Sequence, residues 1–244
     1  MSILDIYSID ARCEFEKGFL MPFICRANSC FYYAKGSNTQ PKGLINEWVC
    51  ASLAKRFGLP VPHFCLLRLD SCLKELVNSE WVQDLEFEYL FGSKSVAPCE
   101  KITVSDIDNY TPELKRDILV FDAWILNNDR MLTDSGGNPN LLITLPNLDL
   151  KVIDHNLAFD TEFNQKDLRN LHVFSKVLET YPIQLPEQAD YCERFESVMD
   201  GFDEIIDQIP NEWIESLSCS GEYLSEIKSI LNNYKNESYW GWLT

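Results

Sequence analysis

Short runs of apolar and β-branched residues mark the first third of the chain. Residues 21–26 (MPFICR) and 30–35 (CFYYAK) are rich in such side chains, and Asn28 with Ser29 between them favours a turn. These two runs predict a β-hairpin. Residues 63–69 (HFCLLRL) predict a further strand, followed by a short helix over residues 71–77. From residue 78 to 108 the pattern is weak and predicts loops and short helices.

Residues 44–57 show a different periodicity, which predicts a helix with one apolar face. The apolar positions recur at a spacing of four: Ile45, Val49, Leu53 and Phe57. Gly58 is expected to end this helix, because the prolines at 60 and 62 cannot continue it. The preceding residues 36–43, which include Pro41, predict a polar loop.

A second helix is predicted from Thr111 over the segment TPELKRDILVFDAWIL, with threonine as its cap and Pro112 in the first turn. A polar loop over residues 127–139 follows, then short strands over 140–145 and 149–153. Residues 163–240 predict mostly helices. Strands are predicted mainly in the first part of the chain and helices mainly in the last part. This order indicates an α+β fold with a small sheet-rich lobe and a larger helical lobe. A cleft between two lobes is the usual place for a ligand.

The composition says more about the possible binding partners than about the fold. The 244 residues carry a net charge of -17, which repels phosphate backbones, so we expect no direct binding to nucleic acid. A basic protein partner would suit this charge, although solubility alone also explains it.

A zinc site, a secretory signal and a membrane span are not expected. Nine cysteines without a Cys-x-x-Cys pair, and three distant histidines, predict buried thiols in a reducing cytoplasm and no zinc site. The N-terminal segment lacks the pattern of a secretory signal. No apolar run reaches about 18 residues, so no membrane span is expected.

Two charged residues could form an ion pair between the predicted hairpin and helix. Lys35 ends the second strand, and Glu47 follows 12 residues later in the helix. Taken singly, each would be an ordinary solvated side chain. As a pair they match the lysine and glutamate that kinases use to hold ATP phosphates.

The loop after the second helix carries the other candidate chemistry. Asp129 can accept a hydrogen bond from a substrate hydroxyl, and Asn138 or Asn140 can offer an amide oxygen to Mg²⁺. Asp154 follows a predicted strand and can also hold the metal. Two carboxylates that face each other repel, so Asp129 and Asp154 together favour a cation between them. An ordinary turn rich in Asn and Asp is an alternative that explains Ser-Gly-Gly well, but it explains Asn-Asn-Asp-Arg after a helix that carries a tryptophan poorly.

Three motifs in this order resemble the HipA-like kinase domain family, especially its short members. They are INEWVCASLAKRFGLPVP, then FDAWILNNDR with NPNLLI, and finally VIDHNLAFD. The resemblance covers roughly residues 15–160. The resemblance implies a protein-kinase-like fold of two lobes, with a sheet-rich N-lobe over residues 1–70 and a helical C-lobe over residues 71–244.

The resemblance also implies a function and roles for named residues. It implies a cytoplasmic serine/threonine kinase that uses ATP and Mg²⁺, acts on a protein substrate, and can be the toxin paired with a cognate antitoxin. Lys35 would contact the phosphates with Glu47 as its partner. Asp129 would be the catalytic carboxylate with Arg130 beside it, and Asp154 would bind the metal.

The sequence departs from the family pattern at three places. The metal-binding asparagine usually lies five residues after the catalytic aspartate, whereas Asn138 lies nine after Asp129, which indicates a short insertion within residues 132–137. The pattern Asn-Pro-Asn-Leu-Leu favours Asn138 as the metal ligand, with Asn140 second. Only Gly18 stands where a glycine-rich phosphate loop is expected, and Asn156 replaces a frequent glycine. These departures keep two alternatives open: a pseudokinase that only binds a nucleotide or partner, and a kinase whose acceptor is a lipid or small molecule.

Overall fold

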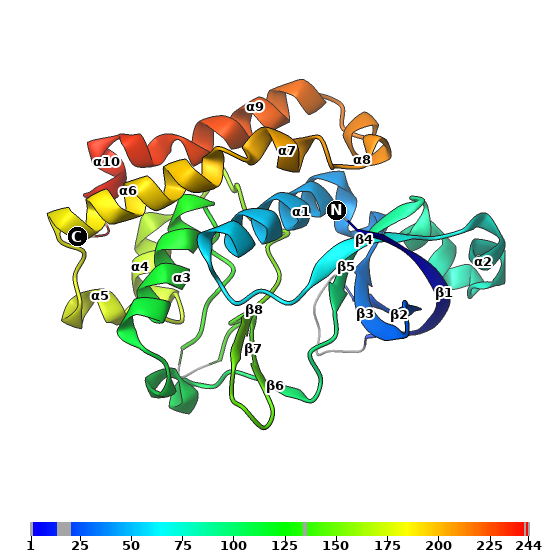
Figure 1. Cartoon of the computed structure of the whole chain (residues 1–244), viewed down its shortest axis with the longest axis horizontal. Coiled ribbons are helices and arrows are strands. Elements are labelled where there is room, and N and C mark those ends of the chain that lie inside the picture. The colour runs from blue at the N-terminus through cyan, green and yellow to red at the C-terminus, as the bar shows by residue number, and fades with distance from the viewer. Residues whose placement is uncertain (1, 14–20, 134–135, 242, 244) are drawn as a thin grey trace.

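The computed structural model describes residues 2–13, 21–133, 136–241 and 243. The chain forms a strand-rich lobe and a larger helical lobe, as the sequence predicts, and both appear in Figure 1. Gly18, the expected remnant of a phosphate loop, lies outside the described residues. The proposed division at residue 70 stays a prediction, and the strand-rich lobe takes one strand from beyond it.

Five strands close the smaller lobe into a barrel of order β1-β2-β3-β5-β4. The strands are β1 (Ile3–Arg12), β2 (Phe23–Ala27), β3 (Cys30–Lys35), β4 (Phe64–Arg68) and β5 (Tyr89–Lys94). Antiparallel pairing joins all neighbours except β1 and β4, which run parallel and close the barrel. Closure leaves no open edge at either end of the sheet.

The predicted hairpin is confirmed as β2 and β3. Asn28 and Ser29 both have positive φ, 45° and 59°, which a type I′ turn requires of its two central residues. Alternate side chains of β2 point inward, and Phe23, Cys25 and Ala27 are fully buried in the barrel core. The pairing of Phe23 with Ala34 places the end of β3, where Lys35 lies, beside the start of β2.

Helix α1 (Gln40–Phe57) is the predicted helix, but it begins four residues earlier than expected, and it is not amphipathic, because residues 43–51 are all buried. Pro41 lies in its first turn rather than in a loop, where the missing N–H of proline costs nothing. A short 3₁₀ segment, Ser37–Thr39, precedes it. The helix ends as predicted at Gly58, whose φ of 95° needs a residue without a Cβ.

The helical lobe contains a second, antiparallel sheet of order β6-β7-β8. Its strands are β6 (Cys99–Lys101), β7 (Leu141–Thr144) and β8 (Leu150–Val152). Helix α3 (Pro112–Trp124) leads toward this sheet, and the hydroxyl of its cap Thr111 accepts a hydrogen bond from the N–H of Leu114. Helix α3 and strands β7 and β8 lie where the sequence predicts them, whereas β1, β5 and β6 were not predicted.

Most of the remaining helices follow β8, and the longest of these is α6. The remaining helices are α2 (Ser71–Leu76), α4 (Gln165–Leu171), α5 (Val177–Thr180), α6 (Leu185–Met199), α7 (Phe202–Ile206), α8 (Asn211–Glu215), α9 (Ser220–Leu231) and α10 (Glu237–Trp240), with 3₁₀ segments at Ser79–Leu85, Val104–Asn109 and Asn233–Lys235. One large core joins α1, α3, α6 and α9, and the rings of Trp124 and Phe195 stack at its centre, 4.2 Å apart. Helix α1 therefore belongs to the core of the helical lobe while it follows directly from the barrel.

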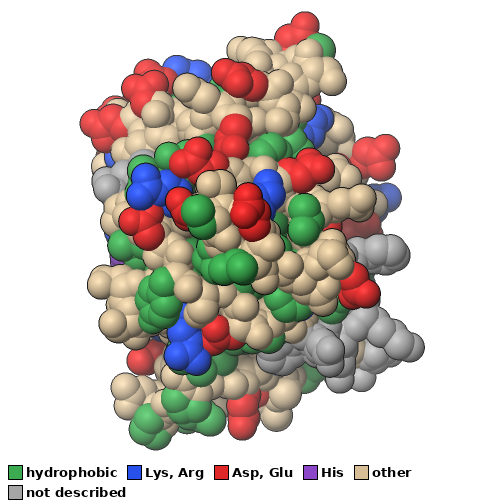
Figure 2. Space-filling view, turned by 90° about the vertical axis from the view of Figure 1, so that its right-hand side faces the viewer, with side chains coloured by type: hydrophobic (Ala, Val, Ile, Leu, Met, Phe, Trp, Pro, Cys, Tyr) green, Lys and Arg blue, Asp and Glu red, His purple; other side chains and the backbone are tan. Residues whose placement is uncertain are grey.

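The surface of the barrel side carries charges of both signs. In Figure 2 acidic and basic side chains are interspersed on this face. Arg26 pairs with Asp10, and Arg68 pairs with Asp5, each at 2.6 Å. No helix among the described residues is long and apolar enough to cross a membrane.

The end of α1 generates a test of the fold. Gly58→Ala should lower the free energy of unfolding by roughly 1 kcal/mol, because a Cβ is strained at a φ of 95° although there is open space around it. Gly221→Ala is the matched control, since Gly221 also has open space but an ordinary φ within α9. Urea denaturation of both variants should show a loss only for the first; equal stability of the two would contradict the assigned cap.

Candidate active site

Three charged side chains from distant parts of the chain meet at one point. Lys35 ends β3, Glu47 lies in the second turn of α1, and Asp154 follows β8. The Nζ of Lys35 donates to Oδ1 of Asp154 at 2.7 Å and forms a close ion pair with Glu47. The ion pair expected between Lys35 and Glu47 is therefore present, and Asp154 joins it.

The electrostatics of this group depend on burial and on mutual attraction. Burial alone would lower the pKa of Lys35, but Asp154 and Glu47 raise it above its ordinary value, so the ammonium stays charged. Burial would raise the pKa of Asp154, yet Lys35 holds it below its usual range. Burial also raises the pKa of Glu47, with Lys35 opposing. One lysine is thus shared by two carboxylates.

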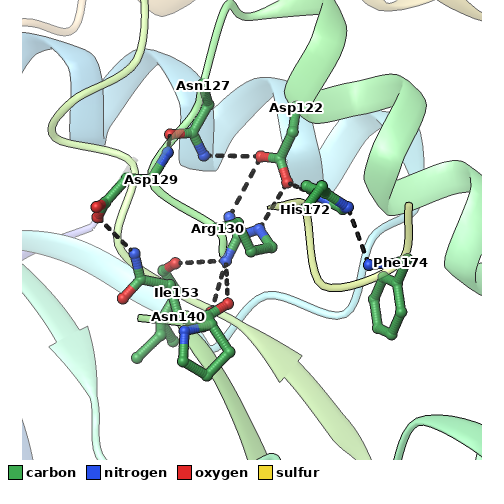
Figure 3. Close-up of polar contacts among 9 residues, drawn as sticks. Asp122, Asn127, Asp129, Arg130, Asn140, Ile153, His172 and Phe174 are labelled. Carbon is green, nitrogen blue, oxygen red and sulfur yellow. Dashed lines mark hydrogen bonds and ion pairs between the residues drawn. The ribbon is translucent and has the colours of Figure 1, made fainter. Parts of the chain in front are cut away.

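Asp129 lies in the loop after α3 and is held by two amides. Asn138 and Asn140 donate to its Oδ2 at 3.1 and 2.8 Å, and Figure 3 shows Asp129 turned toward Asn140. Burial is the main cause that raises the pKa of Asp129, and the charge of Asp154 adds to it. Within the described parts of the chain both amides use the same oxygen, so Oδ1 is open to another donor.

Asn138 reaches Asp129 although nine residues separate them. The N–H of Met131 donates to the carbonyl of Asn138 at 3.1 Å, so the chain leaves after Met131 and returns beside it. A Cβ on Gly137 would lie 2.4 Å from the carbonyl oxygen of Met131, so this close return needs glycine. Met131 and Asn138, which flank the segment where the spacing predicts an insertion, therefore lie next to each other.

Arg130 points away from Asp129 into the protein interior. Its Nε donates to Asp122 at 2.7 Å, and its Nη1 donates to the carbonyls of Asn140 at 2.6 Å and Ile153 at 3.1 Å (Figure 3). The side chain is fully buried. Arg130 was predicted beside the catalytic carboxylate, and its contacts make it a clamp on the backbone of the residues before β7 and after β8.

Asp122 in α3 is the centre of this buried network. It accepts from Asn127 at 2.8 Å, from Arg130, and from Nε2 of His172 at 3.0 Å. Because the N–H of Phe174 donates to Nδ1 of His172, the ring proton is on Nε2. Burial would raise the pKa of Asp122, but Arg130 and His172 hold it well below its usual range. Burial lowers the pKa of His172, which keeps the ring neutral.

One residue of this network carries a signal in its local sequence. Asp122 is an acid within an otherwise apolar stretch of α3, and a buried charge of that kind needs a partner. His172, by contrast, lies 50 residues from Asp122, and nothing in its local sequence points to it.

The two residues that could hold a metal share an unusual backbone. Asp154 has a φ of 60° and Asn140 a φ of 48°, in the left-handed region that Asp and Asn tolerate better than most residues. The N–H of Ile153 donates to the carbonyl of Asn140 at 3.1 Å, so the two turns are directly linked. The side chains of Asp154, Asn140 and Asp129 thus come from adjoining, fixed backbone.

Comparison with known proteins identifies what the chain is similar to. A sequence model of the family described as HipA-like kinase matches residues 6–243. The crystal structure of a proinflammatory kinase, CtkA, of Helicobacter pylori superposes with a TM-score of 0.58 at 14% identity, over 97% of this chain and 95% of that chain. At that identity the likeness shows the fold. No curated protein matches the chain.

The Asp122 network generates a prediction about stability. Asp122→Asn should lower the free energy of unfolding by about 3–5 kcal/mol, because it leaves the guanidinium of Arg130 buried without a counter-charge. Asp203→Asn removes one partner of the exposed pair with Lys228 and should leave stability near the wild-type value. Similar urea midpoints for the two variants would contradict the role of the network.

Proposed function

The chain belongs to the HipA-like kinase family, and we propose that it transfers the γ-phosphoryl group of ATP to a serine or threonine hydroxyl of a protein. The observation that carries the proposal is the meeting of Lys35, Glu47 and Asp154, next to a loop in which two amides orient Asp129. Phosphoryl transfer needs little covalent chemistry from the protein and depends mainly on positioning and on charge.

Lys35 would contact the phosphates of ATP. Its ammonium is held at the end of β3 by Glu47, whose side chain is 2% exposed and has no freedom to reach solvent. Asp154 is 33% exposed, so it is the partner that can exchange Lys35 for another cation. In the proposed complex Lys35 keeps Glu47 and turns its remaining donors to the phosphate oxygens.

Asp154 and Asn140 fit a magnesium site. Both offer oxygen, which Mg²⁺ prefers, and a few protein ligands suffice where phosphates and water complete the shell. The amide nitrogen of Asn140 donates to Asp129, so the Oδ1 of Asn140 would be the atom that binds the metal. Bound Mg²⁺ would neutralise charge on the phosphates and on the facing carboxylates.

Asn140 is favoured over Asn138 as the metal ligand, which reverses the order that the sequence pattern favours. Its side chain is buried between the loop and β7, and its carbonyl is tied both to Arg130 and to Ile153, next to Asp154. Asn138 is exposed and lies just after the segment of the predicted insertion. We propose that Asn138 mainly orients Asp129.

Asp129 would orient the acceptor and take its proton. The open Oδ1 accepts the hydrogen bond of the acceptor hydroxyl, whose oxygen forms a bond to the γ-phosphorus as the bond to the β-bridging oxygen breaks. ADP leaves, and the hydroxyl proton passes to Asp129. The raised pKa of this carboxylate favours such a transfer.

A protein acceptor is proposed over a lipid because of charge. A net charge of -17 disfavours docking on an anionic membrane surface and suits a basic protein segment. A toxin role with a cognate antitoxin rests on the family resemblance alone and stays a prediction.

The first test removes the proposed base. Asp129→Asn should lower transfer of label from γ-labelled ATP by roughly 10²–10⁴-fold, because the amide cannot accept the proton. Binding of ATP, followed by thermal shift, should persist. Unchanged transfer would contradict the role of Asp129. Nucleotide binding without transfer by the wild type would point to a pseudokinase, and label on a lipid or small molecule would contradict a protein acceptor.

A second test separates the two asparagines. Asn140→Ser should raise the Mg²⁺ concentration for half-maximal nucleotide binding by about tenfold or more, because an oxygen ligand is displaced. Asn138→Ser, the matched control, should change it little, and Asp154→Asn should abolish the Mg²⁺ dependence. A larger effect at Asn138 than at Asn140 would reverse the assignment.

A further inference from the structure

Asn46 lies in α1, one residue before Glu47, and its side chain is buried. Its Nδ2 donates to the carbonyl of Asn156 at 3.0 Å and to that of Ala158 at 2.7 Å. Its Oδ1 accepts a hydrogen bond from the hydroxyl of Tyr223. Only this orientation of the amide satisfies both carbonyls, since a reversed amide would set its oxygen against them.

The two carbonyls belong to the loop that follows Asp154, residues 154–160. Asp154 and Phe159 in this loop both have left-handed backbone, with φ of 60° and 58°. Such conformations persist only where surrounding contacts fix them. The N–H of Phe159 donates to the carbonyl of Ile125 at 2.7 Å, so the loop is tied to the end of α3 on one side and to Asn46 on the other.

Tyr223 belongs to α9, 177 residues from Asn46 in sequence, and its side chain is almost fully buried. The ammonium of Lys42, in the first turns of α1, lies 4.7 Å from the centre of its ring. The next residue after Glu47, Trp48, donates its indole N–H to the carbonyl of Ile205 in α7 at 3.1 Å. Helices of the C-terminal region therefore fix α1 on both sides of Glu47.

We propose that Asn46 and Tyr223 are positioning residues of the phosphoryl-transfer site. Adjacent residues of one helix then hold the two partners of the site: Glu47 holds Lys35, and Asn46 holds the loop of Asp154. Tyr223 fixes the amide of Asn46 in the orientation that both carbonyls require. This inference rests on the proposed kinase function and gives the C-terminal helices, which the sequence indicates only as scaffold, a direct role in that site.

The test removes one oxygen atom. Tyr223→Phe should lower kcat about two- to tenfold and raise the Mg²⁺ concentration for half-maximal activity by a similar factor, because one buried hydrogen bond to Asn46 is lost. The matched control is Tyr191→Phe. Tyr191 is equally buried, and its hydroxyl donates to Asp117 at 2.8 Å, away from the site. Loss of stability alone would affect both variants and would not change the Mg²⁺ dependence.

A measurement without turnover separates this inference from the proposed function. Hydrogen–deuterium exchange of residues 154–160 in the nucleotide-free protein should be faster in Tyr223→Phe than in the wild type and unchanged in Tyr191→Phe. If the wild type transfers no phosphate but the exchange differs in this way, the positioning role stands and the proposed function fails. Unchanged exchange in Tyr223→Phe, or equal effects of the two variants on kcat and Mg²⁺ dependence, would overturn the inference.

Discussion

The largely buried ammonium of Lys35 is the constraint around which the candidate site is built. A charge removed from water is tolerated only when it is paired, and here the pairing comes from Glu47 in α1 and Asp154 after β8. One interaction therefore joins the barrel, the following helix and the second sheet. Because two carboxylates share one lysine, with Asp129 adding negative charge nearby, the site has an excess of negative charge that a metal cation can offset.

A second buried charge fixes the loop of Asp129 in the same way. Arg130 is neutralised by Asp122, and its other nitrogen reaches the carbonyls of Asn140 and Ile153. The carbonyl of Asn140 lies just before β7, and the carbonyl of Ile153 lies just before Asp154. The contacts of Arg130 therefore fix the loop of Asp129 relative to Asp154, which pairs with Lys35. The chemical groups of the site are thus positioned through backbone carbonyls, while the side chains that hold the backbone stay inside the protein.

Local sequence patterns predicted several helices and strands, whereas the strands that depend on long-range pairing were missed. The hairpin, α1 and α3 follow from periodicity, turn residues and caps, each of which acts within a few residues. Strands β1 and β5 depend on closing the barrel between distant segments, which no local pattern encodes. The start of α1 was placed too late because Pro41 is as suitable for a first helical turn as for a loop.

The candidate site likewise has some residues that local motifs indicate and others that only the fold brings together. The order of the motifs indicated Lys35, Glu47, Asp129 and Asp154, since each residue type suits one part of phosphoryl transfer. The other contacts of the site join residues at least eight positions apart. They are the bond of Arg130 to Asp122, the bond of His172 to Asp122, and the bonds of Asn46 to the loop after Asp154. They emerge only once the chain is folded.

A crystal structure of the protein with Mg²⁺ and a non-hydrolysable ATP analogue tests the central claim most directly. The account predicts that Lys35 keeps its ion pair with Glu47, releases Asp154 and contacts the phosphates, while Asp154 binds the metal and Asp129 faces the γ-phosphate. A nucleotide bound elsewhere, with Lys35 still bridging Glu47 and Asp154, would contradict it.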